Sequence, residues 1–220
     1  MGDVLEFYDN DKQFPTWGFG GVVQQGGRAE HCFNLVQGGP NATAAGVQGI
    51  MNAYNQAVQN ISLSGPTIFS QVLETAAGIA SSGMDGSQYF VLLILTDGEI
   101  TDMDNTRNAI IRACNLPISI LIVGVGGCEF EKMNLLDGDD GVLKGSDGVT
   151  KASRDIVQFV PFRKFQHKSA EAFSSELLAE IPHQLVSFMK SKGIKPRPKV
   201  QMAQVVATAG VTVDVNYVNK

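Results

Sequence analysis

The sequence has few of the features that mark secreted, membrane-spanning or zinc-binding proteins. Its three cysteines, Cys32, Cys114 and Cys128, lack C-x-x-C spacing, so we expect reduced thiols in an intracellular protein. The longest apolar runs, residues 90–95 and 118–123, are far shorter than the roughly 18 residues that a membrane span requires. The N-terminus has neither the basic nor the apolar part of a signal peptide. We therefore expect a cytoplasmic location.

An excess of positive charge is also absent. Seventeen Lys and Arg residues stand against 22 Asp and Glu residues, which gives a net charge of −5. Because a phosphate backbone attracts basic surfaces, we expect no nucleic-acid partner. The chain is nevertheless 44% hydrophobic over 220 residues, which is enough apolar material for the core of one domain of ordinary size.

Two buried strands with a helix between them form the clearest pattern. Residues 91–96 and 118–123 are continuous apolar runs that end in glycine-containing turns, which is typical of strands buried on both faces. Residues 102–114 carry apolar side chains at helical spacing, with Asp102 or Asp104 as the helix cap. Strand, helix and strand in about thirty residues predict a βαβ unit.

Further strands and helices alternate along the chain. The pattern predicts additional strands at 16–20, 32–35 and 156–160, and helices at 45–58, 68–80 and 169–190. Pro182 should kink the last helix or split it into two. The alternation predicts an α/β fold with a doubly wound, mostly parallel sheet and helices on both faces.

The composition changes after residue 192. We place one domain at residues 1–192 and a basic, proline-containing linker with a C-terminal tail at residues 193–220. Residues 211–218, called the tail strand below, alternate like a strand with one buried face. One basic cluster spans the boundary and consists of Lys190, Lys192, Lys195, Arg197 and Lys199. It either faces an anionic membrane or is a polar helix end that runs into a soluble linker.

Oxygen-bearing side chains occur where this topology places ligands, beyond the carboxyl ends of the strands. Asp97 follows the strongest predicted strand, and Thr67 ends a Ser-Gly-Pro-Thr turn that leads into a helix. One carboxylate and one hydroxyl suit a magnesium ion that keeps several waters. Both residues also have ordinary structural roles, in a turn and in a helix cap. Ser64, Glu99 and Asp102 are second choices at the same rim.

These residues belong to longer stretches that follow one another in a fixed order. The stretches are FYDNDK at 7–12, GFG at 18–20, SGPTIFS at 64–70, residues 88–102 ending in TDGEITD, LPISILIVGVG at 116–126, LDGD at 136–139 and RDIVQFVPF at 154–162. In this order they resemble the von Willebrand factor A-type domain of copines, over roughly residues 4–192.

The resemblance implies a metal-ion-dependent adhesion site that holds Mg²⁺ or Mn²⁺. Thr67 looks like the threonine ligand and Asp97 like the aspartate that reaches the ion, often through water, while a partner's carboxylate completes the shell. It also implies a cytosolic adaptor that binds intracellular proteins and is recruited to the phospholipid plasma membrane when calcium rises. Calcium would act through membrane-binding modules upstream of this domain.

The chain departs from the family pattern at its N-terminus. The family's first strand and its acidic, hydroxyl-bearing loop should precede Asp3, so we expect an N-terminally incomplete domain with half a metal site and weak or absent metal binding. That strand would lie between the strands at 16–20 and 91–96, where each unsatisfied backbone group costs about 1–3 kcal/mol. Either the protein begins earlier, or the tail strand fills the position and presents Asp214 and Asn216 as oxygen ligands.

Three alternative functions remain open. A copine-type domain also occurs in RING ubiquitin ligases, although no zinc-spaced cysteines follow it here. A phosphoryl-transfer or hydrolytic enzyme would use Asp97 to hold a metal electrophile, but the sequence shows neither a general base nearby nor a phosphate-cradling glycine loop. The third is a remnant that folds only with a partner. We predict a non-enzymatic adaptor domain.

Overall fold

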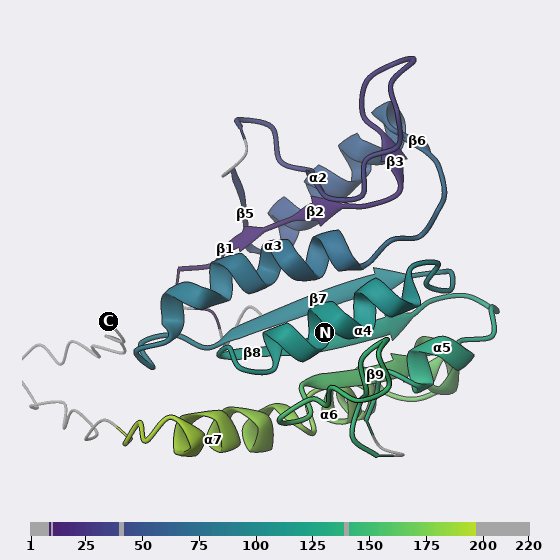
Figure 1. The fold of residues 1–220 in the computed structure, drawn as a ribbon. Coiled ribbons are helices and arrows are strands. Elements are labelled where there is room, and N and C mark those ends of the chain that lie inside the picture. Colours follow the sequence, from purple (N-terminus) through teal and green to yellow (C-terminus); the bar gives the residue numbers. More distant parts are fainter. Residues whose placement is uncertain (1–8, 10, 40–41, 139–140, 197–220) are drawn as a thin grey trace, which may run out of the picture.

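A three-stranded parallel sheet forms the centre of the molecule, and its strands are those that the apolar runs predict. The computed structural model describes residues 9, 11–39, 42–138 and 141–196. The sheet has the order β7–β8–β9, formed by Phe90–Thr96, Ile118–Gly124 and Val157–Pro161 (Figure 1). All seven residues of β8 are buried because this strand is the central one. Burial on both faces explains why its sequence is a continuous apolar run.

Helices cover both faces of the sheet, as predicted (Figure 1). Ile120 and Ile122 of β8 join the apolar cluster formed with α3 and α4, whereas Leu121 and Val123 join the cluster formed with α6 on the opposite face. The helices are α2 (Gly46–Asn60), α3 (Ser70–Ala80), α4 (Met103–Ala113), α5 (Glu131–Asn134), α6 (Ala170–Leu177) and α7 (Ile181–Ser191), with short 3-10 helices η1 (Ser81–Gly83) and η2 (Phe162–Phe165). Helix α4 connects β7 to β8, so the predicted βαβ unit is confirmed.

Pro182 splits the last predicted helix, and α7 begins with this proline in its first turn. A proline is tolerated there because the first helical N–H groups have no intrahelical acceptor. Helix α7 packs on the face that α6 also covers, where Gln184 Oε1 accepts a hydrogen bond of 2.6 Å from Ser119 Oγ of the central strand. The split therefore lets one predicted helix cover the sheet in two segments.

Arg154 fastens the amino-terminal end of the sheet to α7. Its guanidinium donates hydrogen bonds to the carbonyl oxygens of Cys114 (2.8 Å), Leu116 (2.6 Å) and Ile118 (2.9 Å). It also donates to the Gln184 carbonyl of α7 at 3.3 Å. The carbonyls of Cys114, Leu116 and Ile118 lie between the end of α4 and the start of β8, so one side chain satisfies three acceptors of this connection.

The first third of the chain forms short antiparallel pairs instead of further strands of the parallel sheet. The predicted strands at 16–20 and 32–35 appear as β2 (Trp17–Gly18) paired with β4 (Phe33–Asn34). Two further pairs were not predicted: β1 (Gln13–Pro15) with β5 (Thr43–Ala45), and β3 (Gly21–Val22) with β6 (Ser62–Leu63). Strands of two or three residues are too short to show a period of two.

This antiparallel region is attached to α3 through aromatic and polar contacts. The rings of Phe19 and Phe69 meet edge to face, with centroids 5.4 Å apart. Cys32 Sγ lies 3.3 Å from Thr75 Oγ1 of α3. In the part of the chain that the structure describes, no helix is both long enough and apolar enough to cross a membrane. Residues 211–218 and most of the basic linker lie outside the described residues.

Candidate metal-binding rim

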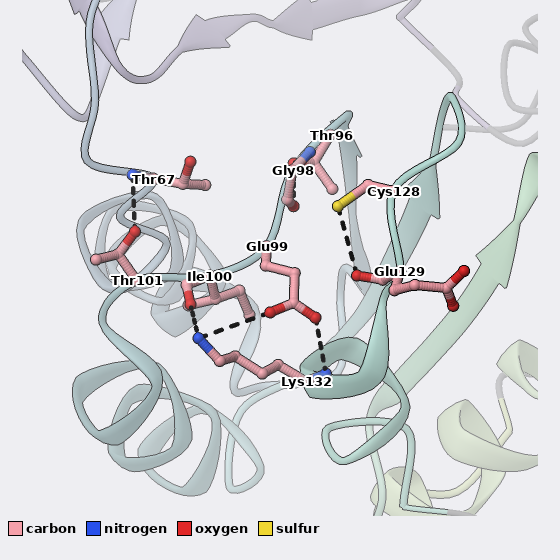
Figure 2. A network of polar contacts seen from close by, with 9 residues as sticks. All are labelled: Thr67, Thr96, Gly98, Glu99, Ile100, Thr101, Cys128, Glu129 and Lys132. Atoms are coloured by element: carbon pink, nitrogen blue, oxygen red, sulfur yellow. Dashed lines mark hydrogen bonds and ion pairs between the residues drawn. The ribbon is translucent and has the colours of Figure 1, made fainter.

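Two loops that are about thirty residues apart in the sequence are joined at the carboxyl-terminal end of β7 (Figure 2). The Thr101 N–H donates to the Thr67 carbonyl oxygen at 2.9 Å, and the Thr67 N–H donates to Thr101 Oγ1 at 3.2 Å. The hydroxyl of Thr96, the last residue of β7, donates a hydrogen bond of 3.1 Å to the Gly98 carbonyl oxygen. These contacts hold the turn that carries Thr67 against the loop that carries Asp97.

Asp102 also strengthens this junction between the two loops. Its carboxylate accepts hydrogen bonds from the backbone N–H groups of Phe69 (3.0 Å) and Ser70 (3.2 Å), at the start of α3. It also accepts one from Thr106 Oγ1 at 3.1 Å, within α4. A carboxylate at a helix N-terminus satisfies donors that lack an intrahelical acceptor. Asp102 therefore ties the start of α3, which follows Thr67, to the start of α4, and these three bonds engage its oxygens.

Thr67 and Asp97 keep their side-chain oxygens available. Neither the Thr67 hydroxyl nor the Asp97 carboxylate forms a hydrogen bond or ion pair with another described residue. Thr67 Oγ1 lies 3.9 Å from the position that a Cβ would take on Gly98, the residue after Asp97. This contact limits the distance from the hydroxyl to the Asp97 Cα to about 9 Å. Asp97 is exposed, whereas Thr67 is half-buried.

The remaining candidates at this rim differ in how far their oxygens are engaged. Glu99 lies beside Lys132, whose Nζ is 3.7 Å from Glu99 Oε2 and whose N–H donates to Oε1 at 3.5 Å (Figure 2). Lys132 Nζ also donates to the Ile100 carbonyl at 3.1 Å. Ser64 Oγ has a long contact of 3.4 Å with the Gly65 carbonyl. The negative charge of Glu99 is therefore neutralised by Lys132, whereas the Ser64 hydroxyl forms only one long hydrogen bond.

The sequence did not single out Thr101 or Lys132, although both shape the rim. Thr101 lies within the TDGEITD stretch and could have been noticed there as a second hydroxyl. Lys132 is 33 residues away from Glu99 at the start of α5, and no local pattern connects the two. Figure 2 also shows Cys128 at this edge, where its thiol donates to the Glu129 carbonyl at 3.5 Å.

The rim has few acidic ligands. Among the described residues, no group of three or more His, Cys, Asp and Glu side chains could hold a metal ion. A cation at Thr67 and Asp97 would therefore need water or a partner for most of its shell, which Mg²⁺ readily accepts. Two cavities, of about 360 and 280 Å³, lie elsewhere. One is lined by residues of β9 and α6, and the other by Ile110 and the loop around Leu143.

The described part of the basic cluster lies at the opposite end of the sheet from the rim. Lys190, Lys192 and Lys195 are exposed at the end of α7, and Arg197 and Lys199 lie outside the described residues. The neighbouring Ile194 contacts Gly86, just before β7 begins. The rim follows the last residue of β7, so the sheet separates these two features.

Comparisons with known proteins agree with the resemblance seen in the motifs. The family model described as "Copine" matches residues 1–197. Protein BONZAI 2 from Arabidopsis thaliana is 48% identical over 198 residues, which covers 89% of this chain and 33% of the relative. Protein BONZAI 1 from the same plant is 47% identical over 200 residues, covering 90% and 34%. The chain thus spans about a third of these relatives, and it belongs to the copine family.

Proposed function

We propose that this domain is a non-enzymatic, protein-binding adaptor whose recognition site is a divalent cation held at Thr67 and Asp97. The observation that supports it is the pair of uncommitted oxygen groups on loops that are tied together by Thr101 and Asp102. A site that is already rigid loses little conformational entropy when it binds a ligand. A hydroxyl and a carboxylate are hard oxygen ligands, which favours Mg²⁺ or Mn²⁺.

The incomplete ligand set explains why a protein partner would bind here. When bound, the cation supplies a positive charge with open coordination positions for an acidic side chain of an intracellular protein. Lys132 neutralises the charge of Glu99 at the same rim, which would reduce the repulsion between Glu99 and an acidic partner. Affinity for the metal alone should be weak, because two protein ligands contribute less than a full shell.

The arrangement of the two ends of the sheet suits an adaptor at a membrane. The exposed lysines near the end of α7 would contribute about 1 kcal/mol each near an anionic leaflet. The rim, at the other end of the sheet, would then face the cytosol and its partners. Calcium-dependent binding to phospholipids and recruitment to the plasma membrane would belong to a longer copine of which this domain is part.

Calorimetric titration of Mg²⁺, Mn²⁺ and Ca²⁺ into the protein tests the metal site. We expect weak Mg²⁺ and Mn²⁺ binding that Asp97→Asn abolishes and Thr67→Val reduces at least tenfold. Asp104→Asn is the matched control, because this α4 carboxylate is also exposed but pairs with Arg107. Equal metal affinity in the Asp97 and Asp104 variants would refute the site, as would the absence of Mg²⁺ and Mn²⁺ binding.

Co-sedimentation with vesicles tests the membrane-facing end separately. Vesicles containing phosphatidylserine should retain the protein more than neutral vesicles, and a Lys190→Ala/Lys192→Ala/Lys195→Ala variant should lose this difference. Because the titration and the sedimentation address opposite ends of the sheet, one can fail without the other. Equal retention of the variant would remove the membrane-facing assignment of the basic cluster.

A further inference from the structure

The cavity of about 360 Å³ beside α6 combines apolar and charged walls. Its apolar lining includes Val160 of β9 and Phe165 of η2, and its charged lining consists of Lys164, Lys168 and Glu176. None of the rim residues belongs to the lining that the structure describes. Ligand pockets usually have volumes of about 300–1,000 Å³ and are apolar with a few charged groups, so this cavity has the character of a small binding site.

The basic residues around η2 differ in whether a carboxylate neutralises them. Arg163 pairs with Glu129 at 3.3 Å, so its charge is compensated. Lys168 Nζ lies over the ring of Phe165, 4.5 Å from the centroid. Neither Lys164 nor Lys168 forms an ion pair with a carboxylate of the described residues. The cavity therefore contains two exposed ammonium groups that have no anionic partner within ion-pair distance.

The net charge of the lining determines which anion the cavity suits. The two lysines and Glu176 together leave one positive charge. A single carboxylate neutralises this charge, whereas a phosphate ester carries a charge of about −1.5 to −2 and would leave a negative excess beside Glu176. The apolar lining adds a preference for a large apolar group next to the carboxylate, because such a group leaves water on binding.

Gln158 adds an unsatisfied acceptor beside the cavity. This β9 residue is only 9% exposed, and its Nε2 donates to the Glu176 carbonyl at 3.5 Å. Its Oε1 has no hydrogen-bond donor among the described residues. Buried polar atoms usually have a partner, so a ligand that brings N–H donors suits this wall of the cavity. A peptide has such donors, whereas a fully ionised phosphate or a fatty acid has none.

We propose that this cavity binds an acidic side chain of a protein partner together with a large apolar side chain next to it in the partner's sequence. Lys164 and Lys168 pair with the carboxylate, and Val160 and Phe165 contact the apolar side chain. Because η2 directly follows the carboxyl end of β9, the site lies at the same end of the sheet as the rim. It requires no metal ion.

An NMR titration of the isotope-labelled protein in EDTA tests this site. The probes are the peptide acetyl-Gly-Phe-Glu-Phe-Gly-amide and the same peptide with Gln in place of Glu. The Glu peptide should shift the backbone amide signals of Phe165, Lys168 and Ala172 saturably, and the Gln peptide should bind at least about tenfold more weakly. Since EDTA removes divalent cations, failure of the metal site at Thr67 and Asp97 would leave this result unchanged.

Two double variants locate the binding. Lys164→Gln/Lys168→Gln should abolish the difference between the two peptides, and both side chains are exposed, so the fold should be retained. Lys144→Gln/Lys151→Gln is the matched control, because it removes the same charge from two exposed lysines that do not line the cavity. This control should bind the Glu peptide as the unmodified protein does.

Four results would overturn the proposal. They are no saturable shift at the cavity, equal affinity for the Glu and Gln peptides, a preference for the Glu peptide that survives Lys164→Gln/Lys168→Gln, and tighter binding of a phosphoserine peptide, which would identify a phosphorylated partner. If the peptides do not bind and Lys164→Gln/Lys168→Gln reduces retention on phosphatidylserine vesicles, the cavity faces a membrane instead of a protein.

Discussion

Replacing Asp102 by alanine should destabilise the domain more than replacing any neighbouring acidic residue of α4. The carboxylate accepts three hydrogen bonds, from Phe69 N–H, Ser70 N–H and Thr106 Oγ1. Hydrogen bonds to charged groups contribute about 1.5–3 kcal/mol each, but Asp102 is only half-buried and water can replace part of the loss. We therefore expect a decrease of about 3 kcal/mol in the free energy of unfolding, which corresponds to a lower Tm by about 6–12 °C.

Urea denaturation followed by far-UV circular dichroism measures this loss. Asp104→Ala is the control, because its carboxylate is exposed and pairs only with Arg107 one turn away, at 2.7 Å. Such pairs contribute about 0.5 kcal/mol or less. A change of less than about 1 kcal/mol in the Asp102 variant, or equal changes in both variants, would refute the role of Asp102 in joining α3 to α4.

Three further predictions concern stability away from the rim. Arg154→Met should lower the free energy of unfolding by about 2–4 kcal/mol in urea denaturation, because several carbonyls lose their donor; a change below 1 kcal/mol would contradict this. Gly124→Ala should cost about 1–3 kcal/mol by the same assay, since the new Cβ would lie 2.8 Å from the Phe130 ring; an unchanged stability would show that the ring moves freely. The hydroxyl of Thr150 and nearby backbone N–H groups donate to the Asp147 carboxylate and lower its pKa. The ionised carboxylate therefore stabilises the loop above the unfolded pKa of about 3.9, and this stabilisation is lost as the pH falls through the lowered pKa. An NMR titration should show the pKa of Asp147 rising in Thr150→Val, and an unchanged titration would exclude this hydrogen bond as the main cause.

The parallel sheet was predictable because its strands form apolar runs, although burial on both faces holds for β8 and β9 and not for β7, where Val91 and Leu95 are exposed. β7 and β8 are continuous apolar runs, and the helices between and after the strands have a clear period. Pro182 marked the split between α6 and α7 correctly. The short antiparallel pairs could not be predicted, since strands such as Ser62–Leu63 form only where a tertiary partner lies opposite.

The sequence singled out the two candidate ligands but not the residues that hold their loops together. Thr67 and Asp97 follow from the motifs and from the position of ligands at the ends of parallel strands. The contacts of Thr101, Asp102 and Lys132 join residues that are 32 to 34 positions apart in the sequence, and only the folded chain brings them together. Asp102 was predicted as a helix cap or a neighbour of the metal, and the structure shows it bonded across two helices.

Anomalous diffraction from crystals of the protein grown with Mn²⁺ tests the central claim most directly, because it places the cation without reference to any motif. The account predicts an anomalous peak at the rim, about 2.1–2.3 Å from Thr67 Oγ1 and bonded to the Asp97 carboxylate directly or through one water. A manganese peak bonded to other residues, with Thr67 and Asp97 ordered and free of metal, would contradict it.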